Sequence, residues 1–119
     1  MTIQEAAALL RQKDNILLLT HRRPDGDTMG CASGLCAALR QLGKTAYVLP
    51  NPDVTEGNAV YAAPYWAPGD FRPDFVVSVD IAARGLFYPA AEQYLDRIGL
   101  AVDHHPSFEH FGKANIVRP

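Results

Sequence analysis

A short aliphatic run near the N-terminus constrains the fold of this chain more than any other feature. The run Ile16–Leu19 is too short for a helix, and its side chains would be apolar on both faces of an extended strand. Strands that are buried on both faces are typical of parallel sheets with helices on either side. The run therefore predicts an α/β fold rather than an antiparallel sheet with one wet face.

Further elements alternate along the chain in the order that such a fold requires. The expected helices cover residues 3–12 and 28–42, and the expected strands cover 16–20, 45–49, 75–80, 99–103 and, more briefly, 115–117. Residues 50–73 hold five of the nine prolines and predict a loop with one helical turn, whereas residues 82–97 predict partial helix interrupted or restarted at Pro89. We expect one three-layer α/β/α domain with a mostly parallel sheet of four or five strands, in the order 2-1-3-4.

Composition narrows the class of protein. The chain has 119 residues, 48% of them hydrophobic, and a formal net charge of −2, so no basic excess indicates a nucleic-acid groove. A short oligonucleotide or small nucleotide still fits this charge if a bound metal supplies positive charge. We expect no membrane association, because no apolar run approaches the ~20 residues of a membrane span and the N-terminus lacks the pattern of a signal peptide. Cys31 and Cys36 are poorly spaced for a disulfide on one helix and are expected as reduced core residues of a cytoplasmic protein.

Polar residues of metal-ligand type follow three of the expected strands. These residues are His21, Asp25 and Asp27 after the first strand, Asp80 after the third, and Asp103, His104 and His105 after the fourth. Taken singly, Asp25-Gly26 is typical of a turn and Asp27 of a helix N-cap. Because the carboxyl ends of parallel strands share one edge of the sheet, their coincidence favours a single site.

Phosphate hydrolysis suits such a cluster of carboxylates and imidazoles. These ligands favour Mn²⁺ or Fe²⁺, with Mg²⁺ or Zn²⁺ as further candidates, and the cysteine positions exclude a thiolate-rich zinc site. Two ions roughly 3.5–4 Å apart can share a bridging carboxylate, activate a water molecule and neutralise charge on phosphate oxygens. The sequence therefore predicts a metal-dependent hydrolase.

The same residues resemble the motifs of a known family, the DHH phosphoesterases. The segment His21-x-x-x-Asp25-x-Asp27 resembles the first motif, Asp80 after an apolar strand the second, and Asp103-His104-His105-Pro106 the third. The resemblance spans residues 5–117. The segment Arg-Pro-Asp-Gly-Asp resembles one branch of the family more than its inorganic pyrophosphatases, which usually have Asn-Pro-Asp-Thr-Asp. This branch contains the nano-RNases, the oligoribonucleases that are also 3′-phosphoadenosine-5′-phosphate phosphatases, and the cyclic-dinucleotide phosphodiesterases.

The resemblance implies a role for each residue. His21, Asp25 and Asp80 would hold one metal ion, and Asp27, Asp80 and His104 would hold a second, with Asp80 as the bridge. The two ions would be Mn²⁺. His105 would face the scissile phosphate and bind it or protonate the leaving group, and Asp103 would orient a histidine.

The chain departs from the family pattern after the third motif. A fourth motif and a C-terminal substrate-binding domain are expected in this family, and residues 1–119 contain neither, so we expect them to represent the N-terminal part of a DHH catalytic domain. Two alternatives stay open. The chain could be a non-catalytic metal-binding or interaction domain, possible as a homodimer, or a manganese-dependent inorganic pyrophosphatase, which Gly26 disfavours because those enzymes usually have Thr there.

Overall fold

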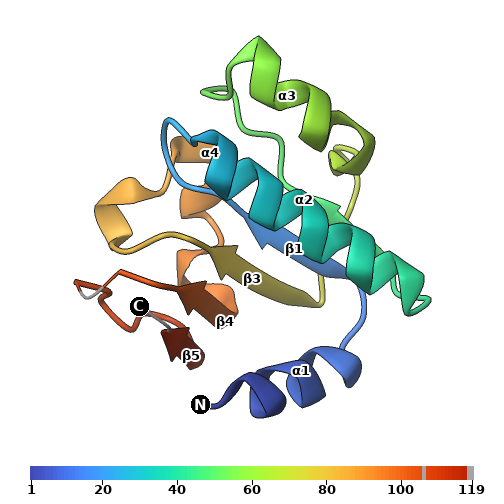
Figure 1. Ribbon diagram of the computed structural model, residues 1–119, viewed down its shortest axis with the longest axis vertical. Helices are drawn as coiled ribbons and strands as arrows, with labels where there is room; N and C mark the ends of the chain where they lie inside the picture. Colours follow the sequence, from blue (N-terminus) through green and yellow to red (C-terminus); the bar gives the residue numbers. More distant parts are fainter. Residues whose placement is uncertain (106, 118–119) are drawn as a thin grey trace.

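The computed structural model describes residues 1–105 and 107–117 and contains a parallel sheet of five strands between two layers of helices (Figure 1). The strands are β1 (Ile16–Leu19), β2 (Ala46–Val48), β3 (Phe75–Val79), β4 (Ile98–Asp103) and β5 (Ala114–Val117). Their order is β2-β1-β3-β4-β5, and every neighbouring pair is parallel. The predicted fold class and strand order are confirmed, and β5 extends the sheet beside β4.

Helices of different length cover the two faces of the sheet. They are α1 (Ile3–Arg11), α2 (Gly26–Gln41), α3 (Glu56–Ala62) and α4 (Pro89–Glu92), with 3-10 turns at Ala63–Tyr65, Arg84–Leu86 and Leu95–Arg97. The alternation of β1 divides the core: Ile16 and Leu18 pack with residues of α1 and α2, whereas Leu17 and Leu19 pack with Phe87 and α4. Residues 82–97 are helical only in part, and Pro89 begins α4, as the sequence predicts.

Helix α2, which follows the turn after β1, begins earlier in the chain than the sequence predicts. Asp25, rather than Asp27, is the N-cap: its side chain accepts a hydrogen bond from the Thr28 backbone N–H at 2.8 Å. The helix therefore starts at Gly26 and ends at Gln41, with Leu42 as its C-cap. Gly43 follows at a φ of 82°, which glycine adopts without steric cost. The early start places Asp27 in the exposed first turn, away from the cap.

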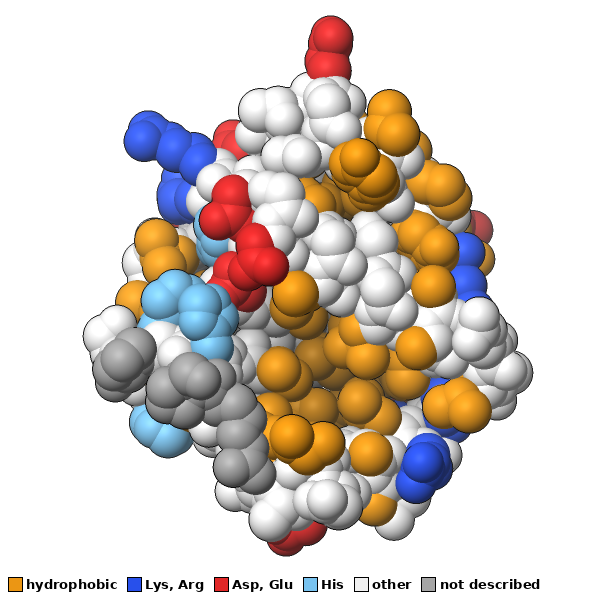
Figure 2. Space-filling view, in the orientation of Figure 1, with side chains coloured by type: hydrophobic (Ala, Val, Ile, Leu, Met, Phe, Trp, Pro, Cys, Tyr) orange, Lys and Arg blue, Asp and Glu red, His pale blue; other side chains and the backbone are white. Residues whose placement is uncertain are grey.

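One sheet face is only partly covered. Between α1 and α2, a hollow lined by hydrophobic side chains exposes β4 and β5 on this face (Figure 2). We call this hollow the apolar groove. It includes Leu35, Leu100, Val102 and Ile116. Cys36 is buried beneath α2 as expected, but Cys31 is exposed at the groove, so its prediction as a core residue is wrong. Among the described residues, no helix has the length and apolarity to cross a bilayer.

Candidate metal centre

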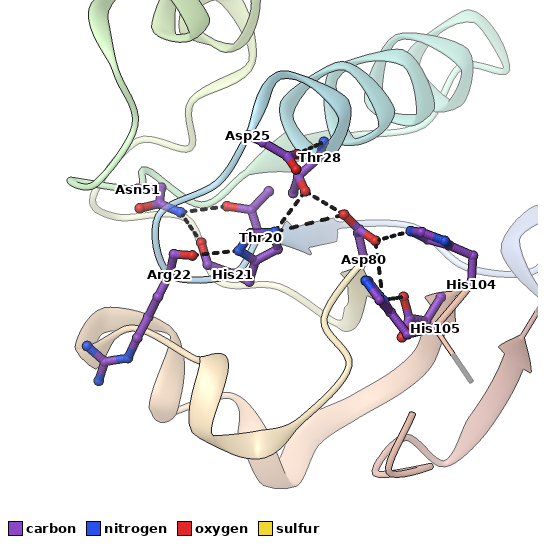
Figure 3. Close-up of polar contacts among 10 residues, drawn as sticks. Thr20, His21, Arg22, Asp25, Thr28, Asn51, Asp80, His104 and His105 are labelled. Atoms are coloured by element: carbon purple, nitrogen blue, oxygen red, sulfur yellow. Dashed lines mark hydrogen bonds and ion pairs between the residues drawn. The ribbon is translucent and has the colours of Figure 1, made fainter. Parts of the chain in front are cut away.

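Asp80 lies at the middle of the polar edge and joins the two halves of the site (Figure 3). It follows β3 directly, its side chain is 10% exposed, and its backbone N–H donates to the Val102 carbonyl at 2.9 Å. Its φ of 61° lies in the left-handed region, which costs a non-glycine residue on the order of 1 kcal/mol. The local backbone is therefore held in a strained conformation that turns this carboxylate toward both neighbouring strand ends.

The first half of the site comes from the turn between β1 and α2. His21, Asp25 and Asp80 each offer a ligand atom, and these atoms all lie within 4.8 Å of one another. The Thr28 hydroxyl is fully buried between them, donating to Asp80 Oδ2 at 2.6 Å and lying 2.9 Å from His21 Nε2. Thr28 thus connects two of the three side chains and, through its backbone N–H, the third.

The polar groups of this half have one acceptor more than their donors can satisfy. His21 Nδ1 lies 2.6 Å from the Arg22 carbonyl, which can only accept, so Nδ1 carries a proton. In the neutral ring the lone pair is then on Nε2, as a metal ligand requires. The single hydroxyl hydrogen of Thr28 has two acceptors, His21 Nε2 and Asp80 Oδ2, and can satisfy only one. A divalent ion would satisfy the other.

The second half comes from the end of β4. His104 Nε2 lies 2.8 Å from Asp80 Oδ1, and His105 Nδ1 lies 2.7 Å from Asp103 Oδ1. Asp80, Asp103, His104 and His105 again place one ligand atom each within 4.8 Å of one another. Asp80 Oδ1 and Asp103 Oδ2 are buried without a hydrogen bond of good geometry to any described group. Such buried carboxylate oxygens fit a bound cation, since leaving them unpaired is costly.

The comparison with protein families shows which family the chain belongs to. The model of the DHH family, N-terminal domain, matches residues 15–119. The chain belongs to the DHH family. The bifunctional oligoribonuclease and PAP phosphatase NrnA of Thermus thermophilus is 31% identical over 108 residues, which cover 87% of this chain and 32% of that protein. This DHH chain therefore spans about a third of the length of that curated relative.

A solved structure agrees on the fold. An exopolyphosphatase-related protein from Bacteroides fragilis has a similar fold, with a TM-score of 0.74 and 22% sequence identity. The match covers 98% of this DHH chain. The match covers 38% of the Bacteroides fragilis chain. At this identity the likeness supports the three-layer architecture and carries nothing about the reaction.

Asp27 and Asp103, both expected from the DHH motifs, lie in different surroundings. Asp27 is exposed in the first turn of α2 and joins neither of the two clusters among the described residues, although it lines the apolar groove together with Asp80 and His104. Asp103 is buried, and its carboxylate accepts a hydrogen bond from the ring of His105 in the same motif. Pro106, the last residue of the third motif, lies outside the described residues.

Local contacts set the charge of two groups. The Thr28 backbone N–H, followed by its hydroxyl, lowers the pKa of the Asp25 carboxyl, so that Asp25 stays ionised as a ligand must. The hydrogen bond that the His105 ring donates to the Asp103 carboxylate raises the pKa of His105 above its ordinary 6.5, with the Asp80 carboxylate acting in the same direction. His105 therefore holds a proton to higher pH than a free histidine does.

Sequence reasoning missed two buried residues that hold the first motif. The sequence predicts Thr28 only as the start of a helix and Asn51 only as part of the proline-rich loop of residues 50–73. Asn51 Nδ2 donates to Thr20 Oγ1 and to the His21 carbonyl, both at 2.9 Å, while its Oδ1 accepts from the Asp53 N–H. A polar residue between two prolines at this sheet edge was the available signal for Asn51.

Proposed function

We propose that this chain is the catalytic region of a metal-dependent phosphoesterase that hydrolyses short oligonucleotides or small nucleotides. The observation that carries the proposal is the meeting of three strand ends on Asp80, whose buried carboxylate lies between a His21–Asp25 pair and a His104–His105 pair. The similarity to an oligoribonuclease and PAP phosphatase supports this substrate class.

The chain's own residues have distinct tasks in this proposal. His21, Asp25 and Asp80 hold one divalent ion, and Asp80, His104 and Asp27 hold a second, with Mn²⁺ favoured by the mixed oxygen and nitrogen ligands. When bound, the ions supply an activated water molecule and offset the negative charge of the phosphate. Asp80 needs its buried and strained position because it serves both halves of the site.

His105 completes the proposed reaction as a proton donor. Asp103 fixes its Nδ1, which leaves Nε2 as the atom that contacts the phosphate or the leaving oxygen. A histidine with a raised pKa keeps its proton to higher pH than a free histidine and can transfer it as the ester bond breaks. The 40% exposure of its side chain gives a substrate access to the ring.

Hydrolysis by the complete gene product tests the proposal. With Mn²⁺, it should cleave the dinucleotide pApA or the phosphomonoester pAp, and Asp80→Ala should reduce the rate by at least about 10³-fold because both halves lose a shared ligand. The variant Asp96→Ala, at an exposed carboxylate outside both clusters, is the matched control. Full activity of Asp80→Ala, or cleavage of pyrophosphate alone, would contradict the proposal.

A second candidate is a binding domain that takes up a single metal ion. The exposed position of Asp27, outside both clusters of described ligands, favours it. Titration of the 119-residue chain with Mn²⁺ separates the two candidates. Two tightly bound equivalents support the two-ion site, whereas one equivalent that is lost in His21→Ala but kept in Asp27→Ala supports the binding domain.

A further inference from the structure

A second cavity lies on the sheet face opposite α1 and α2. This cavity, which we call the β2 pocket, has a volume of about 680 Å³, within the range of small-molecule sites. Leu17 and Leu49 form its apolar floor at the β1–β2 side of the sheet. The segments 67–73 and 90–97 supply its walls. None of the candidate metal ligands lines it.

The charged side chains of the β2 pocket are cationic. Arg72 and Arg97 both line it, and none of the described lining residues is acidic. Arg22 and Arg84, elsewhere on the surface, are paired with glutamates at 3.6 and 3.9 Å. Arg72 and Arg97, in contrast, form no ion pair within the described part of the chain. Two uncompensated guanidinium groups at one cavity favour an anion, most strongly a phosphate.

Backbone carbonyls position both cations, and an aromatic ring contacts Arg97. Arg97 donates to the Pro73 carbonyl at 3.0 Å, and its guanidinium lies 5.5 Å from the centre of the Tyr94 ring. Arg72 donates to the Phe71 carbonyl at 3.3 Å. Each guanidinium keeps further N–H groups for a ligand. The half-buried rings of Phe71 and Tyr94, at the same cavity, offer apolar surface to a planar ring.

We propose that the β2 pocket is a metal-independent binding site for a nucleoside monophosphate. The phosphate binds between Arg72 and Arg97, and the base lies against Tyr94 and Phe71. Pro50, also in the lining, precedes Asn51, whose side chain holds the His21 carbonyl, so the site adjoins the back of the first motif. This inference does not rest on the proposed hydrolase function, because binding here needs none of the metal ligands.

Binding of AMP to the 119-residue chain in excess EDTA tests the inference, by isothermal titration calorimetry and by ¹H–¹⁵N NMR. AMP should bind and shift the amide signals of Gly69, Phe71 and Tyr94. Adenosine and inorganic phosphate should each bind at least about tenfold more weakly, because each keeps only one of the two kinds of contact.

Variants separate the pocket from its surroundings. Arg72→Ala and Arg97→Ala should each weaken AMP binding about tenfold or more, whereas Tyr94→Phe should leave it near the wild-type value. Arg11→Ala, at an exposed arginine in the last turn of α1, is the matched control and should have no effect. Circular dichroism checks that each variant is folded. No binding at millimolar AMP, unchanged affinity in Arg72→Ala, or shifts confined to the residues around Asp80 would overturn the inference.

Discussion

The two halves of the metal centre share Asp80 but differ in how firmly they are held. On the β1 side, His21 has a side-chain exposure of 17%. The Thr28 hydroxyl lies 2.9 Å from its ring, and the Asn51 amide donates to its backbone carbonyl. On the β4 side, His104 and His105 have side-chain exposures of 55% and 40%, and Asp103 and Asp80 are their polar partners among the described residues. One half is therefore preorganised, and the other is open toward solvent and the apolar groove.

The difference has a structural origin. Two neighbouring segments hold the turn after β1. The segment after β2 contacts it through Asn51, which donates to the His21 carbonyl. The segment after β3 contacts it through the Leu86 carbonyl, which accepts from the Arg22 N–H. The end of β4 has α2 on one side and the apolar groove beside it. We infer that affinity for the first ion is determined mainly by the β1 side, whereas the β4 side is the more adaptable part. Three experiments on single residues test this comparison.

Replacement of Thr28 should have the largest effect. Thr28→Val removes the hydroxyl that holds Asp80 Oδ2 and contacts His21 Nε2, while keeping nearly the same shape in a fully buried position. Loss of such a supporting hydrogen bond lowers metal affinity by about 10–100-fold. Titration with Mn²⁺, followed by calorimetry, measures the change.

Thr28→Ser is the matched control, since it restores the hydroxyl and should recover most of the affinity. Unchanged Mn²⁺ affinity in Thr28→Val would show that the β1 half does not depend on this preorganisation.

Replacement of Asn51 should affect folding rather than ligand chemistry. Asn51→Ala leaves the buried Thr20 hydroxyl and the His21 carbonyl without their shared donor, which should lower the free energy of unfolding by about 1–3 kcal/mol. His104→Ala is the comparison on the open half and should change it by less than about 0.5 kcal/mol, because the ring is mostly exposed. Urea unfolding in EDTA measures both. Equal losses in the two variants would break the contrast between a fixed and an open half.

Patterns of burial along the strands can be predicted from the sequence, whereas single tertiary hydrogen bonds cannot. The parallel sheet and its polar edge are predictable because burial on both faces marks the strands, as in Ile16–Leu19, and because the polar residues follow directly where these strands end. Thr28 and Asn51 act through single tertiary hydrogen bonds, to Asp80 and to the His21 carbonyl, which leave no periodic pattern. The left-handed backbone of Asp80 is equally invisible, because aspartate adopts it only where the surrounding fold requires it.

The smallest effect expected is on the titration of His105, in the open half. Its pKa is raised above 6.5, first by the hydrogen bond to Asp103, so protonation of the ring stabilises the folded chain. This contribution is complete below pH 6.5 and is lost as the pH rises through the raised pKa. In metal-free protein, Asp103→Asn should lower the His105 pKa, as measured by histidine NMR, and the stability difference from wild type should shrink as pH increases.

Asp27→Asn is the control for this titration, because Asp27 is not among the groups that act on His105. An unchanged His105 pKa in Asp103→Asn would mean that the ring is not held by this carboxylate in solution. The open half would then lack the 2.7 Å contact with Asp103 that orients its proposed proton donor. His105 would need the phosphate itself, or a bound ion, to fix its position. The comparison between the two halves would become sharper in that case, because only the β1 side would be organised before ligands bind.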